Sequence, residues 1–220
     1  RFGPTLARLS SNFIMQDHTQ IQKQIQSQKE DALEPVVEIS GDSERLDLEV
    51  LTHYFESLPR DSSILLLGRF QIDRLRLLHC TQFKLTSDSI EFQTRPDLKI
   101  RCLTVHQSKG LEADYVIVLN NREAKLGFPA HVKDPPLKTE LIKIAEELRL
   151  DQVSVNEERR LFYVALTRAK KQVILLTVDG KESSFIKELR RKFREDFTTY
   201  YLSHFEKYQV MKSSLQETIP

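Results

Sequence analysis

The sequence predicts an α/β fold, in which a mainly parallel sheet is flanked by helices on both faces to give three layers. Short apolar runs such as SILLLG (Ser63–Gly68) and DYVIVL (Asp114–Leu119) have the length and composition of strands that are buried on both faces. These runs alternate with segments whose apolar residues recur at helical spacing. Because parallel neighbours need crossover connections, this alternation favours a parallel sheet covered by helices.

The expected elements follow one another along the chain. Apolar residues between Thr5 and Met15 fall on one helical face, and the glutamine-rich residues 16–35 after them are expected to form a polar linker or hairpin. Further strands are expected at Val36–Ile39, Leu98–Val105 and Gln172–Val178. Further helices are expected at Ser43–Leu58, with Ser43 as the N-cap, and at Ile72–Leu78, Pro136–Leu150, Asn156–Lys170 and Ser183–Phe197.

Composition bounds the class of protein. With 220 residues, 40% of them hydrophobic, the chain can bury one core, so we expect residues 1–220 to form a single domain. A net charge of +1 gives no sign of a nucleic-acid partner by itself. Cys80 and Cys102 lack zinc-ligand spacing, and we expect reduced thiols in a cytoplasmic protein. No apolar run approaches the roughly 20 residues of a membrane span, so no membrane contact is expected. The chain begins at Arg1, and we expect it to be part of a longer protein.

Three charged junctions adjoin the predicted strands. Gly68-Arg69 follows one strand, HQSKGLEAD (His106–Asp114) follows another, and TRAKK precedes the strand at Gln172. Ligands of parallel sheets bind beyond the ends of strands, so these junctions are candidate binding sites. Arg168 stands near the end of an otherwise apolar helix, where a guanidinium is costly to bury unless an anion meets it. Taken alone, Arg168 suits a structural salt bridge better than a phosphate contact.

Other charged residues have simpler explanations. Glu157 and Glu158 are expected to stabilise the opening turn of their helix through the backbone dipole, by about 0.3–1 kcal/mol each. Arg159 and Arg160 are expected to form ion pairs that hold this helix against its neighbours. The interspersed acids of ELRRKFRED (Glu188–Asp196) favour a solvated helix surface over a DNA-binding face.

Two of these segments resemble motifs of a known family. TVHQSKGLEADYVIVL (Thr104–Leu119) is similar to motif V of the UvrD/Rep-type superfamily 1 DNA helicases, and EERRLFYVALTRAKK (Glu157–Lys171) is similar to their motif VI. SILLLGR (Ser63–Arg69) resembles motif IV less specifically, and RFGPTLARLSSNFI (Arg1–Ile14) resembles the segment that leads into the second motor domain. Within the family, the helicase IV type is most similar. The resemblance implies a RecA-like C-terminal motor domain.

The resemblance also implies contacts to ATP bound between two RecA-like domains. Arg69 and Arg168 match arginines that reach its γ-phosphate, where paired guanidiniums stabilise transition-state charge as arginine fingers do. Glu112 matches a glutamate that hydrogen-bonds the ribose, and Gly110 is expected to shape the turn before it. Many relatives carry an adenine-stacking aromatic residue before the motif IV arginine, but Gly68 stands there and cannot stack.

Single-stranded DNA is the second partner that the resemblance implies. Thr104 and His106 match positions near the strand, where a hydroxyl and an imidazole can donate to phosphate oxygens. The short separation of Arg69 from Thr104 leaves no room for the large accessory subdomain that many relatives insert there. A compact member of the family is therefore expected.

The hydrolytic half of an ATPase is absent from this sequence. No glycine opens the phosphate-binding pattern GxxxxGK[ST], and no acidic pair follows an apolar strand as a magnesium site would need. We therefore expect an N-terminal P-loop motor domain of the same protein as partner, with the Mg²⁺ ligands outside this chain and no metal site within it. The chain alone is expected neither to hydrolyse ATP nor to unwind DNA.

The alternative is a non-catalytic RecA-like module of a decayed motor that binds DNA or protein, and an upstream P-loop would distinguish the two. A nuclease or a self-sufficient nucleotide-binding enzyme lacks the acidic cluster or Gly-rich loop that it would need.

Overall fold

The computed structural model describes residues 2–17, 34–41, 46–75, 77, 81–86, 89–130 and 151–201, with only the backbone described for residues 46–50 and 151–154. The helices are α1 (Pro4–Ile14), α2 (Leu46–Glu56), α3 (Gln71–Leu75), α5 (Asp151–Leu166) and α6 (Ser184–Lys192). The strands are β1 (Val36–Gly41), β2 (Ser63–Gly68), β3 (Phe83–Leu85), β4 (Ser89–Phe92), β5 (Lys99–Thr104), β6 (Ala113–Val118), β7 (Ala169–Val178) and β8 (Thr198–Tyr201).

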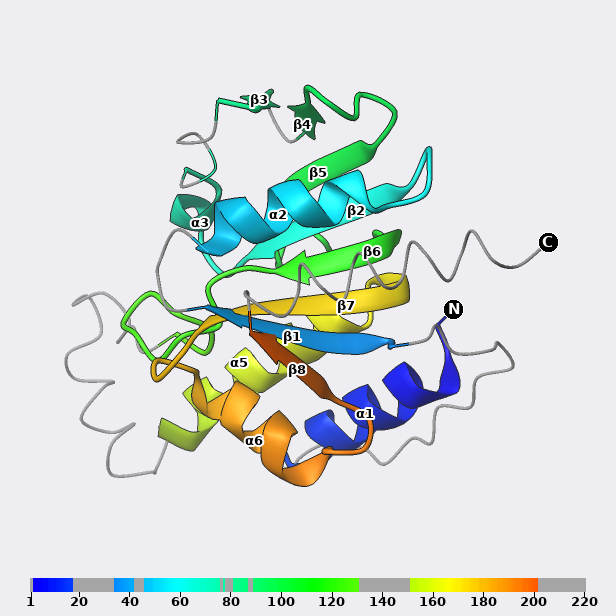
Figure 1. Ribbon diagram of the computed structural model, residues 1–220. Coiled ribbons are helices and arrows are strands. Elements are labelled where there is room, and N and C mark those ends of the chain that lie inside the picture. The colour runs from blue at the N-terminus through cyan, green and yellow to red at the C-terminus, as the bar shows by residue number, and fades with distance from the viewer. Residues whose placement is uncertain are drawn as a thin grey trace.

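The strands form one sheet in the order β3-β4-β5-β2-β6-β7-β1-β8 (Figure 1). Neighbours from β5 across to β8 run parallel, whereas β3 and β4 form a hairpin that joins β5 antiparallel. β2 lies between β5 and β6, with Gly68 opposite Thr104 and Leu67 opposite Val118. The α/β fold with a mainly parallel sheet, predicted from the sequence, is confirmed.

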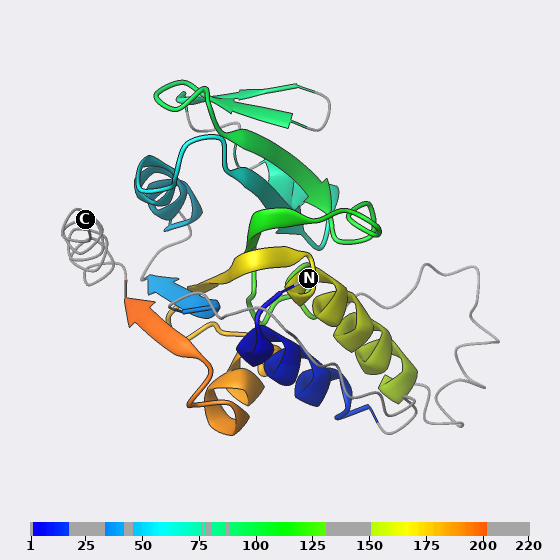
Figure 2. The ribbon, with the colours of Figure 1, turned by 90° about the vertical axis from the view of Figure 1, so that its right-hand side faces the viewer.

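Helices cover both faces of this sheet. Alternate side chains of β2 point to opposite faces, so that Leu65 and Leu67 join the hydrophobic cluster of α1, α5 and α6. Ile64 and Leu66 join the cluster of α2. Figure 2 shows α2 on one side of the sheet and α1 with α5 on the other. Burial on both faces explains why the apolar runs of the sequence are continuous rather than alternating.

Aromatic side chains join three helices on one face of the sheet. The rings of Phe13 on α1, Phe162 on α5 and Phe185 on α6 lie with their centroids 5.2 to 5.4 Å apart. Each such pair adds about 0.5–1.5 kcal/mol beyond the burial of its surface. All three rings are almost completely buried, so they fix the position of α5 relative to its neighbours.

Both arginines that were expected to brace α5 form ion pairs. Arg159 pairs with Glu188 of α6 at 2.7 Å, and its guanidinium lies over aromatic rings of α1 and α6 at 4.5 and 5.0 Å. Arg160 pairs with Asp17 at 3.3 Å and with Glu157 at 3.4 Å. The structural explanation of these two residues is confirmed.

Some elements differ from the expectations. α5 begins before Asn156 and ends at Leu166, because the chain after it enters the sheet, where Ala169 of β7 lies opposite Ala113 of β6. The sequence does not predict β3, β4 and β8, since each is short and mixes polar with apolar side chains. The N-cap at Ser43, the helix at Pro136–Leu150 and most of residues 16–35 lie outside the described residues.

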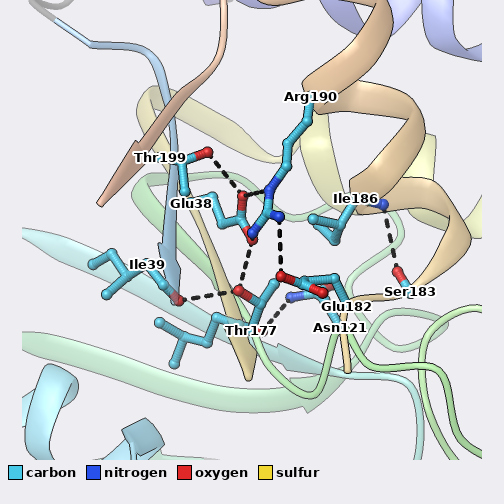
Figure 3. Close-up of polar contacts among 10 residues, drawn as sticks. Glu38, Ile39, Asn121, Thr177, Glu182, Ser183, Ile186, Arg190 and Thr199 are labelled. Atoms are coloured by element: carbon cyan, nitrogen blue, oxygen red, sulfur yellow. Dashed lines mark hydrogen bonds and ion pairs between the residues drawn. The ribbon is translucent and has the colours of Figure 1, made fainter. Parts of the chain in front are cut away.

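A buried carboxylate ties β1 to its neighbours (Figure 3). Glu38 on β1 has no exposed surface, and its oxygens accept from Arg190 of α6 at 2.6 and 2.7 Å. They also accept from Thr177 of β7 at 2.7 Å and from Thr199 of β8 at 3.0 Å. The hydrogen bonds to Glu38, and then the charges of Glu38 and Glu182, raise the pKa of Arg190. An arginine expected on a solvated helix surface therefore helps to hold four elements together.

Removing this carboxylate should strongly destabilise the protein. Glu38→Ala leaves the Arg190 guanidinium without its main acceptor, and removing one partner of a buried pair costs about 3–5 kcal/mol. The control Glu91→Ala breaks an exposed pair with Lys84 at 3.9 Å, for which a loss of about 0–1 kcal/mol is expected. Urea denaturation of both variants measures the free energy of unfolding. Equal losses would contradict this role of Glu38.

Candidate functional site

Polar residues gather where β2 and β5 end. Gly68 and Thr104, the last residues of these strands, lie opposite each other in the parallel register. The chain continues into Arg69 and Phe70 after β2, and into the turn 105–110 after β5. The backbone N–H of the first residue of that turn donates to Gly68 O at 3.0 Å, which holds the two connections side by side. We call this end of the sheet the carboxyl edge.

Arg69 is held at the carboxyl edge by Glu158 of α5. Its Nε and Nη2 donate to the carboxylate at 2.7 to 3.0 Å in a bidentate pair. Glu158 Oε2 also accepts from the backbone N–H of Ala130 at 3.0 Å. The Arg69 side chain is 18% exposed and that of Glu158 only 7%, so Arg69 is the more exposed partner of a mostly buried pair. The guanidinium also lies 4.7 Å from the centroid of the Phe70 ring.

Thr104 belongs to a cluster of hydroxyl and amide groups next to Arg69. Gln107 Oε1 accepts from Thr104 N and from Thr104 Oγ1, each at 3.0 Å. The same oxygen accepts from Gln71 Nε2 at 3.2 Å. Gln71 is the first residue of α3, so this amide joins the start of α3 to the turn after β5. Both glutamines are exposed, and the cluster therefore offers neutral donors and acceptors at the surface.

His106 lies exposed on the same turn, two positions after Thr104. Partial burial, followed by the positive charges of Arg69 and Lys109, lowers the pKa of His106 from its ordinary 6.5, and the carboxylate of Glu158 acts in the opposite direction. The lowered pKa favours the neutral form of the imidazole. His106 therefore feels the charges of both members of the Arg69–Glu158 pair.

Gly68 is required by the close approach of α3. A Cβ at this position would lie 2.6 Å from Asp73 Cβ and 2.9 Å from Asp73 Oδ2. Asp73 is itself fixed, since its carboxylate is buried and accepts from Phe70 N at 2.9 Å and from Asn120 Nδ2 at 2.9 Å. A side chain larger than hydrogen, an aromatic one included, would therefore collide with Asp73 at position 68.

Arg168 lies at the opposite end of the strands, between α5 and β7. Its Nε donates to Val164 O at 3.1 Å and its Nη1 donates to Leu111 O at 3.2 Å. Its Nη2 donates to Thr167 Oγ1 at 3.3 Å. Carbonyls in the last turn of a helix lack partners within the helix, so these bonds cap α5 and fasten it to the segment that precedes β6.

Glu112 lies at the same end as Arg168. It directly precedes Ala113 of β6, which is opposite Ala169 of β7. We call this end of the sheet the amino edge. Gly110 has φ +86°, and a Cβ there would meet no atom within 4 Å. The backbone conformation therefore requires glycine at this turn, whereas the available space does not.

The structure does not bring Arg69 and Arg168 together. The six residues of β6 separate the two edges by about 20 Å at ~3.3 Å per residue. Glu158, which holds Arg69, precedes Arg168 by a stretch that is mostly helix, equivalent to about 15 Å at ~1.5 Å per residue. The carboxyl edge therefore groups Arg69 with Thr104 and His106, and the amino edge groups Arg168 with Glu112.

One segment connects the two edges. Residues 105–112 leave β5 at the carboxyl edge and enter β6 at the amino edge. Val105 and Leu111 pack in the cluster that contains α5. Ser108 between them is buried, and its Oγ donates to Val105 O at 2.7 Å. The segment therefore lies against α5 along the face of the sheet.

Sequence reasoning missed Glu158 and Gln107. An acid in the first turn of a helix has an adequate explanation, but α5 begins at Asp151, so Glu158 lies beyond the first turn. The one available signal was Arg69, because a guanidinium at the end of a buried strand needs an acidic partner. Within the described residues, no group of three or more His, Cys, Asp or Glu side chains could hold a metal ion. None of the helices in the described part of the chain is long and apolar enough to cross a membrane.

Together, the parallel sheet, its helical layers and the polar connections at both edges define a RecA-like α/β domain. A family model described as the UvrD-like helicase C-terminal domain matches residues 7–180. The chain belongs to this family. The resemblance to UvrD/Rep-type helicases inferred from the sequence motifs is confirmed.

Two relatives and one solved structure illustrate the similarity. DNA helicase IV of Escherichia coli (strain K12) is 31% identical over 192 residues, which cover 86% of this chain and 25% of that protein. One of the ATP-dependent helicase/nuclease subunits, from Staphylococcus haemolyticus (strain JCSC1435), is 38% identical over 109 residues, or 40% of this chain and 9% of that protein. The chain thus spans about a quarter or less of these relatives. The crystal structure of the C-terminal domain of a possible DNA helicase from Lactobacillus plantarum WCFS1 has a TM-score of 0.51 at 16% identity. It covers 90% of this chain and 97% of that one, and it supports the fold.

The pKa of His106 tests the geometry of the carboxyl edge. Arg69→Gln removes a positive charge that lowers this pKa, so the pKa should rise toward its ordinary value. Burial still opposes protonation in the variant. The control Lys84→Gln, on the edge strand β3, should leave it unchanged, because Lys84 is not among the charges that shift this pKa. An NMR titration of the histidine ring protons measures both effects, and an unaltered pKa in Arg69→Gln would contradict the placement of His106 near Arg69.

Proposed function

We propose that this chain is the C-terminal motor domain of an ATP-dependent DNA helicase or translocase. The proposal rests on one observation: two chemically different groups of residues lie at opposite ends of the same strands. Residues 105–112 run from one end to the other. In this proposal the amino edge meets ATP and the carboxyl edge meets single-stranded DNA. The proposed location is the cytoplasm, in keeping with DNA as the substrate.

The donor set at the amino edge suits a nucleotide. The Arg168 guanidinium matches the geometry and charge of a phosphoryl group, and the Glu112 carboxylate suits ribose hydroxyls. Gly110 provides the turn that places Glu112. When bound, ATP with its Mg²⁺ supplies a phosphoanhydride bond for hydrolysis, and the metal ligands and P-loop are assigned to a preceding motor domain. Arg168 binds the terminal phosphate from this side and stabilises the charge that develops on it.

The carboxyl edge suits the phosphodiester backbone of a single strand. Thr104 offers a hydroxyl, and His106 offers a neutral imidazole that can donate from one ring nitrogen. We assign Arg69 to this edge rather than to the γ-phosphate, because Arg69 and Arg168 lie at opposite edges of the sheet, which the six residues of β6 separate by about 20 Å at ~3.3 Å per residue. The amino edge is thereby left with a single arginine finger.

Movement along DNA follows from the rigidity of the sheet. Arg168 fastens the end of α5 to Leu111, and Leu111 belongs to the segment that starts beside Thr104. A change in the contacts of Arg168 is therefore transmitted along a packed segment to the strand-binding edge. Opening and closing of this domain against the P-loop domain would shift its hold on DNA relative to that of its partner.

The chain alone should show no DNA-stimulated ATP turnover. It lacks the GxxxxGK[ST] pattern and the acidic residues that position Mg²⁺ and water. A phosphate-release assay of the 220-residue chain with and without oligothymidine measures this. DNA-stimulated turnover by the chain alone would contradict the division of labour between two domains. A full-length sequence without an upstream P-loop would favour the non-catalytic interaction module.

In the full-length protein, Arg168→Ala should lower ATP turnover by about 10²-fold or more, because an arginine finger contributes at least that much to phosphoryl transfer. DNA affinity should stay largely unchanged, since Arg168 lies at the other edge. Arg168→Lys keeps the charge but loses the planar fork and should recover little activity. Lys170→Ala, which removes an exposed charge nearby, is the control. Loss of DNA binding with turnover preserved would contradict the assignment, and thermal melting checks that each variant is folded.

A further inference from the structure

The role of Glu158 at the carboxyl edge is not explained by the proposed contacts. Its Oε1 accepts from Arg69 Nε at 3.0 Å and from Nη2 at 2.7 Å. Its Oε2 accepts from Arg69 Nε and from Ala130 N, each at 3.0 Å. We propose that Glu158 is a fixed counter-charge that weakens the hold of Arg69 on the phosphates of single-stranded DNA. This inference rests on the assignment of the carboxyl edge to DNA.

The electrostatic argument follows from the order of the charges. Arg69 is the more exposed partner and Glu158 is almost fully buried, so a phosphate that approaches from solvent meets the Arg69 side chain before the carboxylate. The carboxylate is only one hydrogen bond farther away, and it repels the same phosphate. Because the pair has no net charge, its attraction at longer range is small. Arg69 then orients the phosphate through its hydrogen bonds but adds little net electrostatic attraction.

The surroundings of Glu158 keep this counter-charge in place. The Ala130 N–H binds one carboxylate oxygen, and the side chain is 7% exposed on α5. Swinging away from Arg69 would break these bonds and leave a buried carboxylate without its cation. The carboxylate therefore stays behind Arg69 when a strand binds.

A counter-charge of this kind suits a domain that must release its ligand in every cycle. Changes in affinity within one interface act mostly on the dissociation rate. An arginine at full charge would slow the release of each phosphate, whereas a neutralised arginine allows faster exchange along the strand. Glu158 thus lowers the affinity of the carboxyl edge for single-stranded DNA without contacting the DNA itself.

Neutralising Glu158 should strengthen binding, and the chain provides a matched control. Glu157 precedes it on α5, its side chain is 53% exposed, and it pairs with Arg160 instead. Glu158→Gln and Glu157→Gln remove the same charge from the same helical turn. Fluorescence anisotropy of labelled oligothymidine with the 220-residue chain, over a range of salt concentrations, compares them.

We expect Glu158→Gln to bind at least about threefold more tightly than Glu157→Gln at low salt, in the range of one partly exposed charge pair. Its log K against log[salt] slope should steepen by about 0.7, the effect of one added phosphate contact on a single strand. Its dissociation rate should fall in stopped-flow experiments. Glu158→Asp, which retains the charge, should behave like the wild type. Equal binding by the two glutamine variants, or tight binding by Glu158→Asp, would overturn the inference.

The double variant Arg69→Ala/Glu158→Gln removes both charges and leaves no unpaired ion, so it tests the inference even if Glu158→Gln does not fold. Its salt slope should stay near that of the wild type, since the pair contributes little net charge. A slope reduced by about 0.7 would show that Arg69 acts at full charge and would overturn the inference.

Two further variants separate this inference from the proposed function. Arg69→Ala leaves the carboxylate unpaired, so it should bind more weakly than the wild type, and Thr104→Ala should also weaken binding. If both weaken binding but Glu158→Gln does not strengthen it, only the counter-charge is wrong. If the wild-type chain binds no oligothymidine at low salt, or if neither variant weakens binding, the assignment of the carboxyl edge to DNA is wrong as well.

Discussion

The parallel register of β2 with β5 and β6 is the constraint on which the candidate site depends. Parallel strands all begin at one edge and all end at the other, so Arg69 and Thr104 share one edge while Glu112 and Arg168 share the other. α5 runs back between these edges, and for that reason one helix meets Arg69 through Glu158 and caps its own end with Arg168. An antiparallel β5 or β6 would instead bring residues of both groups to one edge.

Much of the fold follows from sequence because its central strands are buried on both faces. The run SILLLG is continuous and apolar for that reason, and β2 has the predicted bounds. β8 could not be found in this way. Its residues TTYY are only partly buried, and its place beside β1 comes from pairing between residues far apart in the chain, to which the bond from Thr199 to Glu38 adds. The motifs gave the residue types of the site but not their arrangement, because motif order does not record at which end of a strand each motif lies.

The arginines also show that sequence identifies charged residues of interest but not their partners. Arg69, Arg159 and Arg190 each pair with a carboxylate, yet the partners lie on different elements and the consequences differ. Arg159 and Arg190 brace helices within the fold, whereas Arg69 pairs at an edge where a ligand can arrive. Arg168 differs again, since backbone carbonyls of Val164 and Leu111 bind its guanidinium. Sequence identifies such residues as costly to bury, but only the folded structure shows which carboxylate or carbonyl compensates for the desolvation of each guanidinium.

The connection between β5 and β6 also has a mechanical consequence. Since the two edges are the two ends of the same strands, a pull at Thr104 that is resisted at Arg168 acts along the strand axes. The hydrogen bonds of β2 with β5 and β6 then carry the load in shear, all together, rather than opening one after another. A sheet resists shear along its strands more than peeling across them, so a small displacement at one edge reaches the other with little loss.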